Sequence, residues 1–113
     1  MLNLYSVCGD WNSSDFSDKR EWTFLVDSDK GALVFEIDED VKFVDLLDMV
    51  IDDFGIEDKE VILSYELPQS LKVLLKVSPP VFIRNDRRLK SFIKKLKEDA
   101  VIISLFVTVR NSF

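Results

Sequence analysis

The stretch that decides the fold is residues 22–37, which read WTFLVDSDKGALVFEI. Large apolar residues occupy alternate positions of 22–26, and β-branched and aromatic residues dominate 32–37, two patterns typical of strands. The DSDKG segment between them supplies turn residues, and Gly31 can adopt positive φ there. We therefore expect 22–26 and 32–37 to form a β-hairpin.

Residues 41–54, which follow this pair of strands, predict an amphipathic helix. Its apolar residues have the i, i+3, i+4, i+7 spacing of one buried face: Phe43, Leu46, Leu47, Val50 and Phe54. Asp40 has the chemistry of an N-cap, and Gly55 lies where a residue in the left-handed region commonly ends a helix. The hairpin is thus followed by a helix that buries one face.

The segment before the hairpin combines a strand with a long connection. Residues 2–7 (LNLYSV) predict a short strand. Residues 10–21 (DWNSSDFSDKRE) are polar and show no hydrophobic period, which predicts a flexible loop.

The second half of the chain predicts further strands and a second helix. Residues 61–67 and 81–83 are expected to be strands, whereas 69–78 are ambiguous and include a short strand as one option. Asn85 is a suitable N-cap for a helix over 86–97. The apolar stripe of this helix consists of Leu89, Phe92, Ile93 and Leu96.

The last segment, residues 101–109, is apolar almost throughout, as in a central strand that is buried on both faces. The expected order is β-ββ-α-β(β)-α-β, an α+β chain with two helices and a mixed sheet. This order favours a β-grasp fold, the ubiquitin-like roll, as a single domain over residues 1–113. A ferredoxin-like βαββαβ topology is the alternative, and the hairpin before the first helix argues against it.

Charge is strongly segregated along the chain. The net charge is -6, yet residues 84–97 carry seven cations and one acid. At 100° per residue, the cations of the second helix point away from its apolar stripe. We call these helix cations, together with Arg84 just before the helix, the basic face: Arg84, Arg87, Arg88, Lys90, Lys94, Lys95 and Lys97. It is either a solvated surface or a surface that binds a partner.

A second charged surface, of the opposite sign, is expected on the first helix. We call it the acidic face: Asp45, Asp48, Asp52 and Asp53. No EF-hand spacing accompanies these carboxylates, and nothing sets two of them across a cleft, so we expect neither a metal site nor glycoside chemistry. A solvated surface and an acidic docking surface remain as interpretations.

Residues that commonly carry catalysis or bind cofactors are scarce. The chain has no histidine and one cysteine, Cys8, which argues against His-containing triads, internal disulfides and a structural zinc site. The three glycines are isolated, so no phosphate-binding loop is expected. We therefore expect a protein that is not an enzyme and has no cofactor and no small-molecule substrate.

Cysteine usage and hydropathy bear on the compartment. A single cysteine fits a reducing environment. No apolar run approaches the ~20 residues that a membrane span needs. We expect a nuclear or cytoplasmic protein without a membrane partner.

Several phrases of the sequence occur in an order that resembles the N-terminal module of plant Mutator-like (MuDR-type) transposases. They are CGDW (8–11), WTFLVD (22–27), LLDMVIDDFGI (46–56), VILSYELP (61–68), SPPVFIRNDRRLKSFIKKLK (78–97) and SLFVTV (104–109). That module is similar to the Phox/Bem-type interaction domain, which has a β-grasp fold. The resemblance implies a non-catalytic role in protein–protein interaction.

The sequence departs from the charge pattern of Phox/Bem-type domains. Acidic-type domains carry an Asp/Glu-rich motif before the second helix, where this chain has PVFIRNDRRL, with only Asp86 to match an acid. Basic-type domains use a lysine on the first strand, and neither LNLYSV nor WTFLV contains one. The usual front-to-back docking of the family therefore cannot be carried over to this chain residue by residue.

The expected partner is a protein, or a second copy of the chain, held through faces of opposite charge. Because exposed ion pairs are worth only ~0.2–1 kcal/mol each, several must act together. Nucleic-acid contact through the basic face is the alternative. The acidic balance of the chain and the lack of an aromatic residue among the exposed cations argue against it.

Overall fold

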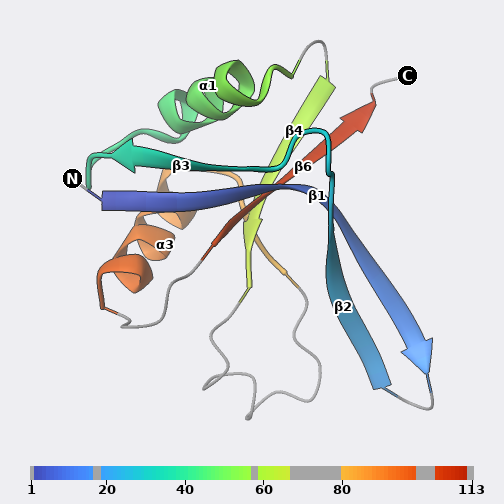
Figure 1. Cartoon of the computed structure of the whole chain (residues 1–113). Coiled ribbons are helices and arrows are strands. Elements are labelled where there is room, and N and C mark those ends of the chain that lie inside the picture. Colours follow the sequence, from blue (N-terminus) through green and yellow to red (C-terminus); the bar gives the residue numbers. More distant parts are fainter. Residues whose placement is uncertain (1, 17–18, 57–58, 67–79, 99–103, 112–113) are drawn as a thin grey trace.

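The computed structural model describes residues 2–16, 19–56, 59–66, 80–98 and 104–111. These residues form a mixed α+β fold with two helices and a six-stranded sheet (Figure 1). In chain order the elements are β1 (Leu2–Phe16), β2 (Lys19–Val26), β3 (Ala32–Ile37), α1 (Phe43–Phe54), β4 (Lys59–Tyr65), β5 (Val81–Ile83), α3 (Asp86–Glu98) and β6 (Leu105–Asn111). The ambiguous segment 69–78 and the first residues of the expected last strand, 101–103, lie outside the described residues.

The sheet has the strand order β2-β1-β6-β4-β5, and β3 also pairs with β1. The last strand, β6, lies in the middle, as its apolar sequence predicts. It is parallel to β1 and antiparallel to β4. Three strands precede α1, so the ferredoxin-like alternative is not adopted. The topology is compatible with a β-grasp-like fold.

The predicted hairpin between 22–26 and 32–37 is wrong. These segments, in β2 and β3, each pair with β1: Gly9–Phe16 with β2, and Leu2–Val7 with β3. The residues between them do form a turn, with Gly31 at φ 68° and its amide donating to the Asp27 carbonyl at 2.8 Å. This turn interrupts one long strand instead of reversing the chain. The reason is β1, whose 15 residues offer a partner to both segments.

The predicted loop over 10–21 is also wrong. Residues 10–16 continue β1 and residues 19–21 begin β2, in an antiparallel ladder from Gly9↔Val26 to Phe16↔Lys19. The paired strands extend away from the helices (Figure 1). A ladder is held by backbone hydrogen bonds, which need no hydrophobic period in the sequence. The polar sequence of residues 10–21 therefore did not indicate that these residues belong to β1 and β2.

The antiparallel ladder formed by residues 10–16 of β1 and 19–26 of β2 is called the arm. An aromatic cluster joins this arm to the rest of the sheet. The Trp11 ring lies 5.1 Å from that of Phe24 and 4.9 Å from that of Phe106, measured between centroids. The Trp11 indole Nε1 also donates a hydrogen bond to Ser64 Oγ at 2.9 Å. The cluster thus connects β1, β2, β6 and β4.

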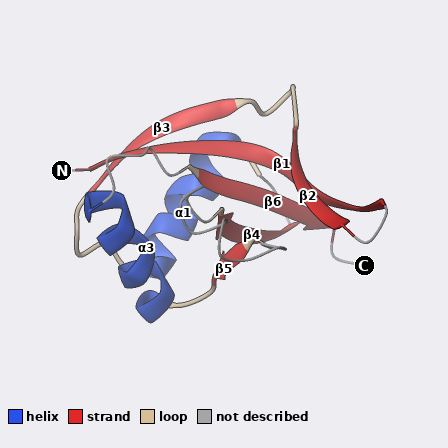
Figure 2. Ribbon diagram, turned by 90° about the horizontal axis from the view of Figure 1, so that it is seen from below, coloured by secondary structure: helices blue, strands red, loops and turns tan. Residues whose placement is uncertain are grey.

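The main core lies between the sheet and the two helices, which are on the same side of it (Figure 2). Leu46 and Val50 of α1 and Leu89 and Phe92 of α3 are fully buried. Phe54 and Ile93 are also buried, and Phe43, Leu47 and Leu96 are partly buried against the same core. Both predicted apolar stripes are confirmed, so the cations of α3 are left to face solvent.

The ends of the helices are held partly by distant residues. Asn85 caps α3 as predicted, because its Oδ1 accepts the Arg88 amide at 2.9 Å. Gly55 ends α1 in the left-handed region, also as predicted, and Lys30 Nζ donates to its carbonyl at 3.3 Å. The prediction of Asp40 as the N-cap of α1 is wrong. The N-cap is Lys42, which makes no side-chain capping bond.

The first amide of α1 is instead satisfied from the other helix. Asp86 Oδ1 accepts the Phe43 N–H at 2.7 Å. Asp86 stands 43 residues away in sequence and lies in the first turn of α3. One carboxylate therefore ties the two helix N-termini together, a contact that no local capping pattern indicates.

We expect Asp86→Ala to lower the free energy of unfolding by about 1 kcal/mol, the typical cost of losing an N-cap. Asp40→Ala removes a similar exposed carboxylate from the connection before α1 and is expected to cost less than about 0.5 kcal/mol. Urea titrations followed by circular dichroism measure both values. A larger loss for Asp40→Ala would contradict this assignment of the cap.

Candidate interaction surface

The basic face lies on α3 and on the residue that follows β5. Asn85 starts the helix and its apolar stripe fixes the rotation about the helix axis, so the cations have no access to the core. Lys95 is half-buried. The other six cations are exposed: Arg84, Arg87, Arg88, Lys90, Lys94 and Lys97. The structure therefore brings the predicted basic residues together on one surface.

Two members of the basic face have partners. Lys97 Nζ forms an ion pair with Glu39 Oε2 at 2.9 Å. The guanidinium carbon of Arg84 lies 4.9 Å from the centroid of the Phe82 ring, a cation–π contact. No ion pair joins the remaining five side chains to any residue that the structure describes: Arg87, Arg88, Lys90, Lys94 and Lys95.

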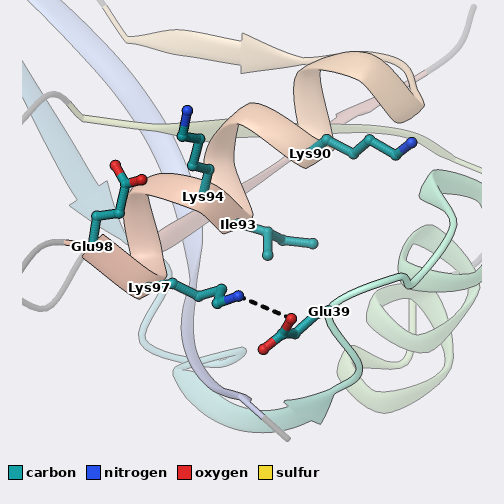
Figure 3. Close-up of a pocket in the computed structure, with 6 residues that line it drawn as sticks. All are labelled: Glu39, Lys90, Ile93, Lys94, Lys97 and Glu98. Atoms are coloured by element: carbon teal, nitrogen blue, oxygen red, sulfur yellow. Dashed lines mark hydrogen bonds and ion pairs between the residues drawn. The ribbon is translucent and has the colours of Figure 1, made fainter.

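A groove runs along α3 between Lys90 and Glu98 (Figure 3). Its volume is about 380 Å³, and it is lined by Glu39, Lys90, Ile93, Lys94, Lys97 and Glu98. Lys97 reaches across it to Glu39, which belongs to the connection between β3 and α1. Three lysines and two glutamates therefore line the groove, with one apolar side chain, Ile93, among them.

The acidic face lies on the exposed side of α1. Asp45, Asp48, Asp52 and Asp53 are all exposed, and none of the described contacts pairs them with a cation of α3. Val44, beside them, is 64% exposed. The structure thus places both predicted charged faces on the surface but does not bring them together within one chain.

Three features of this surface were missed by sequence reasoning. Glu39 was not among the predicted interaction residues, yet it is the residue that pairs with Lys97. Ile93 was given a purely structural role, although it also lines the groove. The expectation that no aromatic residue lies among the exposed cations is wrong, because Phe82 is 37% exposed beneath Arg84. Alternation within 81–83 was the available signal, since Val81 and Ile83 point toward the core and Phe82 away from it.

Two further ionisable side chains, Cys8 and Tyr65, are buried. The Cys8 thiol is 2% exposed, and its pKa is raised by desolvation and, to a smaller extent, by the nearby Asp27 carboxylate. Desolvation also raises the pKa of Tyr65, an effect that Arg88 partly offsets. The raised pKa of Cys8 disfavours the thiolate, which is the nucleophilic form of cysteine.

Two further kinds of site concern metals and membranes. Among the residues that the structure describes, no three His, Cys, Asp or Glu side chains gather as a metal site would require. No helix in those ranges has the length and apolar character needed to cross a membrane.

Comparison with known proteins gives no relative: no family model, no curated protein and no solved structure matches the chain. The resemblance to Mutator-like transposases therefore stays a prediction, and functional inference depends on the surface itself.

Proposed function

We propose that this chain is a non-catalytic protein-interaction module that binds an acidic protein surface through its basic face. The observation that carries the proposal is the set of five cations on α3 without an ion pair among the described residues. A merely solvated helix usually mixes charges of both signs on its surface, which lowers the repulsion between like charges. On the basic face of α3 the repulsion between like charges is not reduced in this way, as expected of a surface that is complementary to an acidic partner.

The chain carries a candidate partner surface of its own. The acidic face lies on α1, which has 12 residues, and the basic face lies mainly on α3, which has 13. Two helices of nearly equal length with opposite charges can dock along their whole exposed sides. We propose weak self-association through these faces. Such a contact joins different surfaces of two copies, so it produces chains or rings unless both junctions close within a dimer.

The resemblance to Mutator-like transposases supports the same role. It implies a β-grasp module that binds proteins and works beside a catalytic domain, in the nucleus. We propose that the chain is such a module or a domesticated relative of one. The absence of histidine from the sequence is consistent with a non-catalytic role.

Self-association should weaken as salt rises, because exposed ion pairs are screened within about 10 Å at 0.1 M ionic strength. We expect sedimentation equilibrium to give oligomers at low salt and monomers at high salt. Lys94→Glu/Lys95→Glu should be monomeric at both. The control is Asn3→Glu/Thr23→Glu, which changes the net charge in the same direction at two exposed strand positions away from α3.

A loss of association in this control equal to that in the lysine variant would show that net charge, not the basic face, governs the effect. A wild-type monomer at low salt and high concentration would refute self-association and leave only a different acidic partner.

Nucleic-acid binding is the second candidate. It is favoured by Phe82, since an exposed aromatic ring beside cations is a stacking surface for bases. The acidic face and the net charge of -6 oppose it. A mobility shift of duplex or single-stranded DNA by the wild type, lost in Lys94→Glu/Lys95→Glu, would favour this function over protein docking.

A further inference from the structure

The charged residues of the two helices have spacings that mirror each other. Along α3, the lysines that line the groove are separated by four residues and then by three: Lys90, Lys94 and Lys97. Along α1, the aspartates on one side are separated by three residues and then by four: Asp45, Asp48 and Asp52. Steps of three and four residues keep side chains on one side of a helix, and they advance about 4.5 Å and about 6 Å. The steps between the lysines, read from the N-terminal end of α3, therefore equal the steps between the aspartates, read from the C-terminal end of α1.

We infer that α1 of a second copy lies antiparallel along α3, with three ion pairs in register. The pairs are Asp52 with Lys90, Asp48 with Lys94, and Asp45 with Lys97. This inference rests on the proposed self-association and specifies its geometry. A parallel arrangement aligns only two of the three pairs at once. The lysines then follow a step of four with a step of three, whereas the aspartates follow a step of three with a step of four.

One lysine of the groove already pairs with a carboxylate. Glu39 Oε2, on the wall of the groove, lies 2.9 Å from Nζ of Lys97, the last lysine of the row. The two side chains are 59% and 46% exposed, so water can replace either partner and the pair can exchange. Asp45 of the second copy takes the place of Glu39 on Lys97. Lys90 and Lys94, which have no ion-pair partner among the described residues, receive the other two aspartates.

The floor of the groove strengthens these pairs. Ile93 is only 4% exposed and lies among the lysines, whose methylene stems add further apolar surface. Carboxylates that enter the groove therefore lose part of their contact with water. Ion pairs are stronger in such surroundings than on an open surface.

A single chain cannot form these contacts with itself in the observed arrangement. Among the described residues, the aspartates of α1 make no ion pair with α3, and the only carboxylate paired with an α3 lysine comes from Glu39. The counterpart of Asp45, Asp48 and Asp52 must come from another molecule, and charge complementarity with matched spacing identifies a second copy as the occupant.

The register is tested by two double variants of the full chain with the same net charge. In Lys94→Asp/Asp48→Lys the exchanged charges face each other across the proposed junction. In Lys90→Asp/Asp48→Lys the lysine introduced at position 48 faces Lys94, and the aspartate introduced at position 90 faces Asp52. Sedimentation equilibrium at low salt measures the dissociation constant of each variant. All the substituted side chains are exposed, and circular dichroism confirms that each variant is folded.

We expect each single reversal to weaken association by about 2- to 10-fold. The in-register double variant should return to within about twofold of the wild type, whereas the out-of-register variant should stay at least as weak as its single reversals. Equal dissociation constants for the two double variants would overturn the register.

A mixture separates failure of the register from failure of the proposed function. When Lys94→Asp and Asp48→Lys chains are mixed, the acidic face of the first and the basic face of the second are both intact. Complex formation in the mixture, together with equal double variants, refutes the register and retains docking between the faces. No complex in the mixture and no association of the wild type refute the docking of one copy on another.

Discussion

Replacing Phe92 by alanine is expected to lower the free energy of unfolding by about 3–5 kcal/mol. Phe92 is fully buried at the centre of α3, and its ring lies 5.0 Å from that of Tyr65. Removal of the ring leaves a cavity between α3 and the sheet, because neighbouring strands are held in register and cannot collapse into it. Domains of this size are typically stable by about 5–15 kcal/mol, so the loss is a large fraction of the total.

Phe82→Ala is the matched control, since it deletes the same ring ten residues earlier at an exposed position. Phe82 is 37% exposed and contacts the Arg84 guanidinium. Its removal forfeits a surface cation–π contact and little core packing, so we expect a loss below about 1 kcal/mol. Urea unfolding of both variants gives the comparison. Similar losses would mean that α3 does not pack on the core through Phe92.

Gly9→Ala is expected to cost about 3 kcal/mol, at the upper end of the range for overpacking. Gly9 pairs with Val26 on one side and Thr108 on the other, so it lies between strands. A Cβ at this position would overlap the Leu25 carbonyl oxygen and come within 2.8 Å of Phe24 Cε2. The obstacle is mainly backbone held in the β1–β2 ladder, which cannot rotate away as a side chain can.

Gly55→Ala provides the comparison for this prediction. Gly55 has φ 67° and nothing within 4 Å of an added Cβ, so its substitution meets conformational strain without a clash. We expect a cost of about 1–2 kcal/mol, the usual penalty for a side chain in the left-handed region. Thermal and urea unfolding would rank the two variants. A greater loss at Gly55 would show that the close approach of β2 to Gly9 is relieved at little cost.

The two helices could be largely predicted from the sequence. Leu46, Val50 and Phe54 define the buried side of α1 by spacing alone, and Asn85 marks the start of α3. The basic face followed from the same periodicity, because cations that cannot enter the core must lie on the opposite side of the helix. Such signals are local: the residues that create them are three or four positions apart.

Strand partners could not be predicted in the same way. The segments 22–26 and 32–37 were correctly identified as extended, yet both pair with β1 and not with each other. The parts of the arm formed by 10–16 and 19–21 have no hydrophobic period, so nothing in their own sequence distinguishes them from a loop. Pairing is decided by which backbone lies alongside, and that depends on residues far away in the chain.

The candidate interaction surface also has a part that the sequence predicts and a part that depends on tertiary contacts. The sequence by itself determined that seven cations gather on α3 and around its start, that four aspartates gather on α1, and that both sets avoid the core. Only the tertiary structure decided that Glu39 reaches Lys97, that Asp86 caps α1, and that Ile93 lines a groove between lysines. The physical reason is that helical periodicity fixes the direction of each side chain relative to its own helix, whereas the contacts between charged groups depend on how the helices and strands pack against one another.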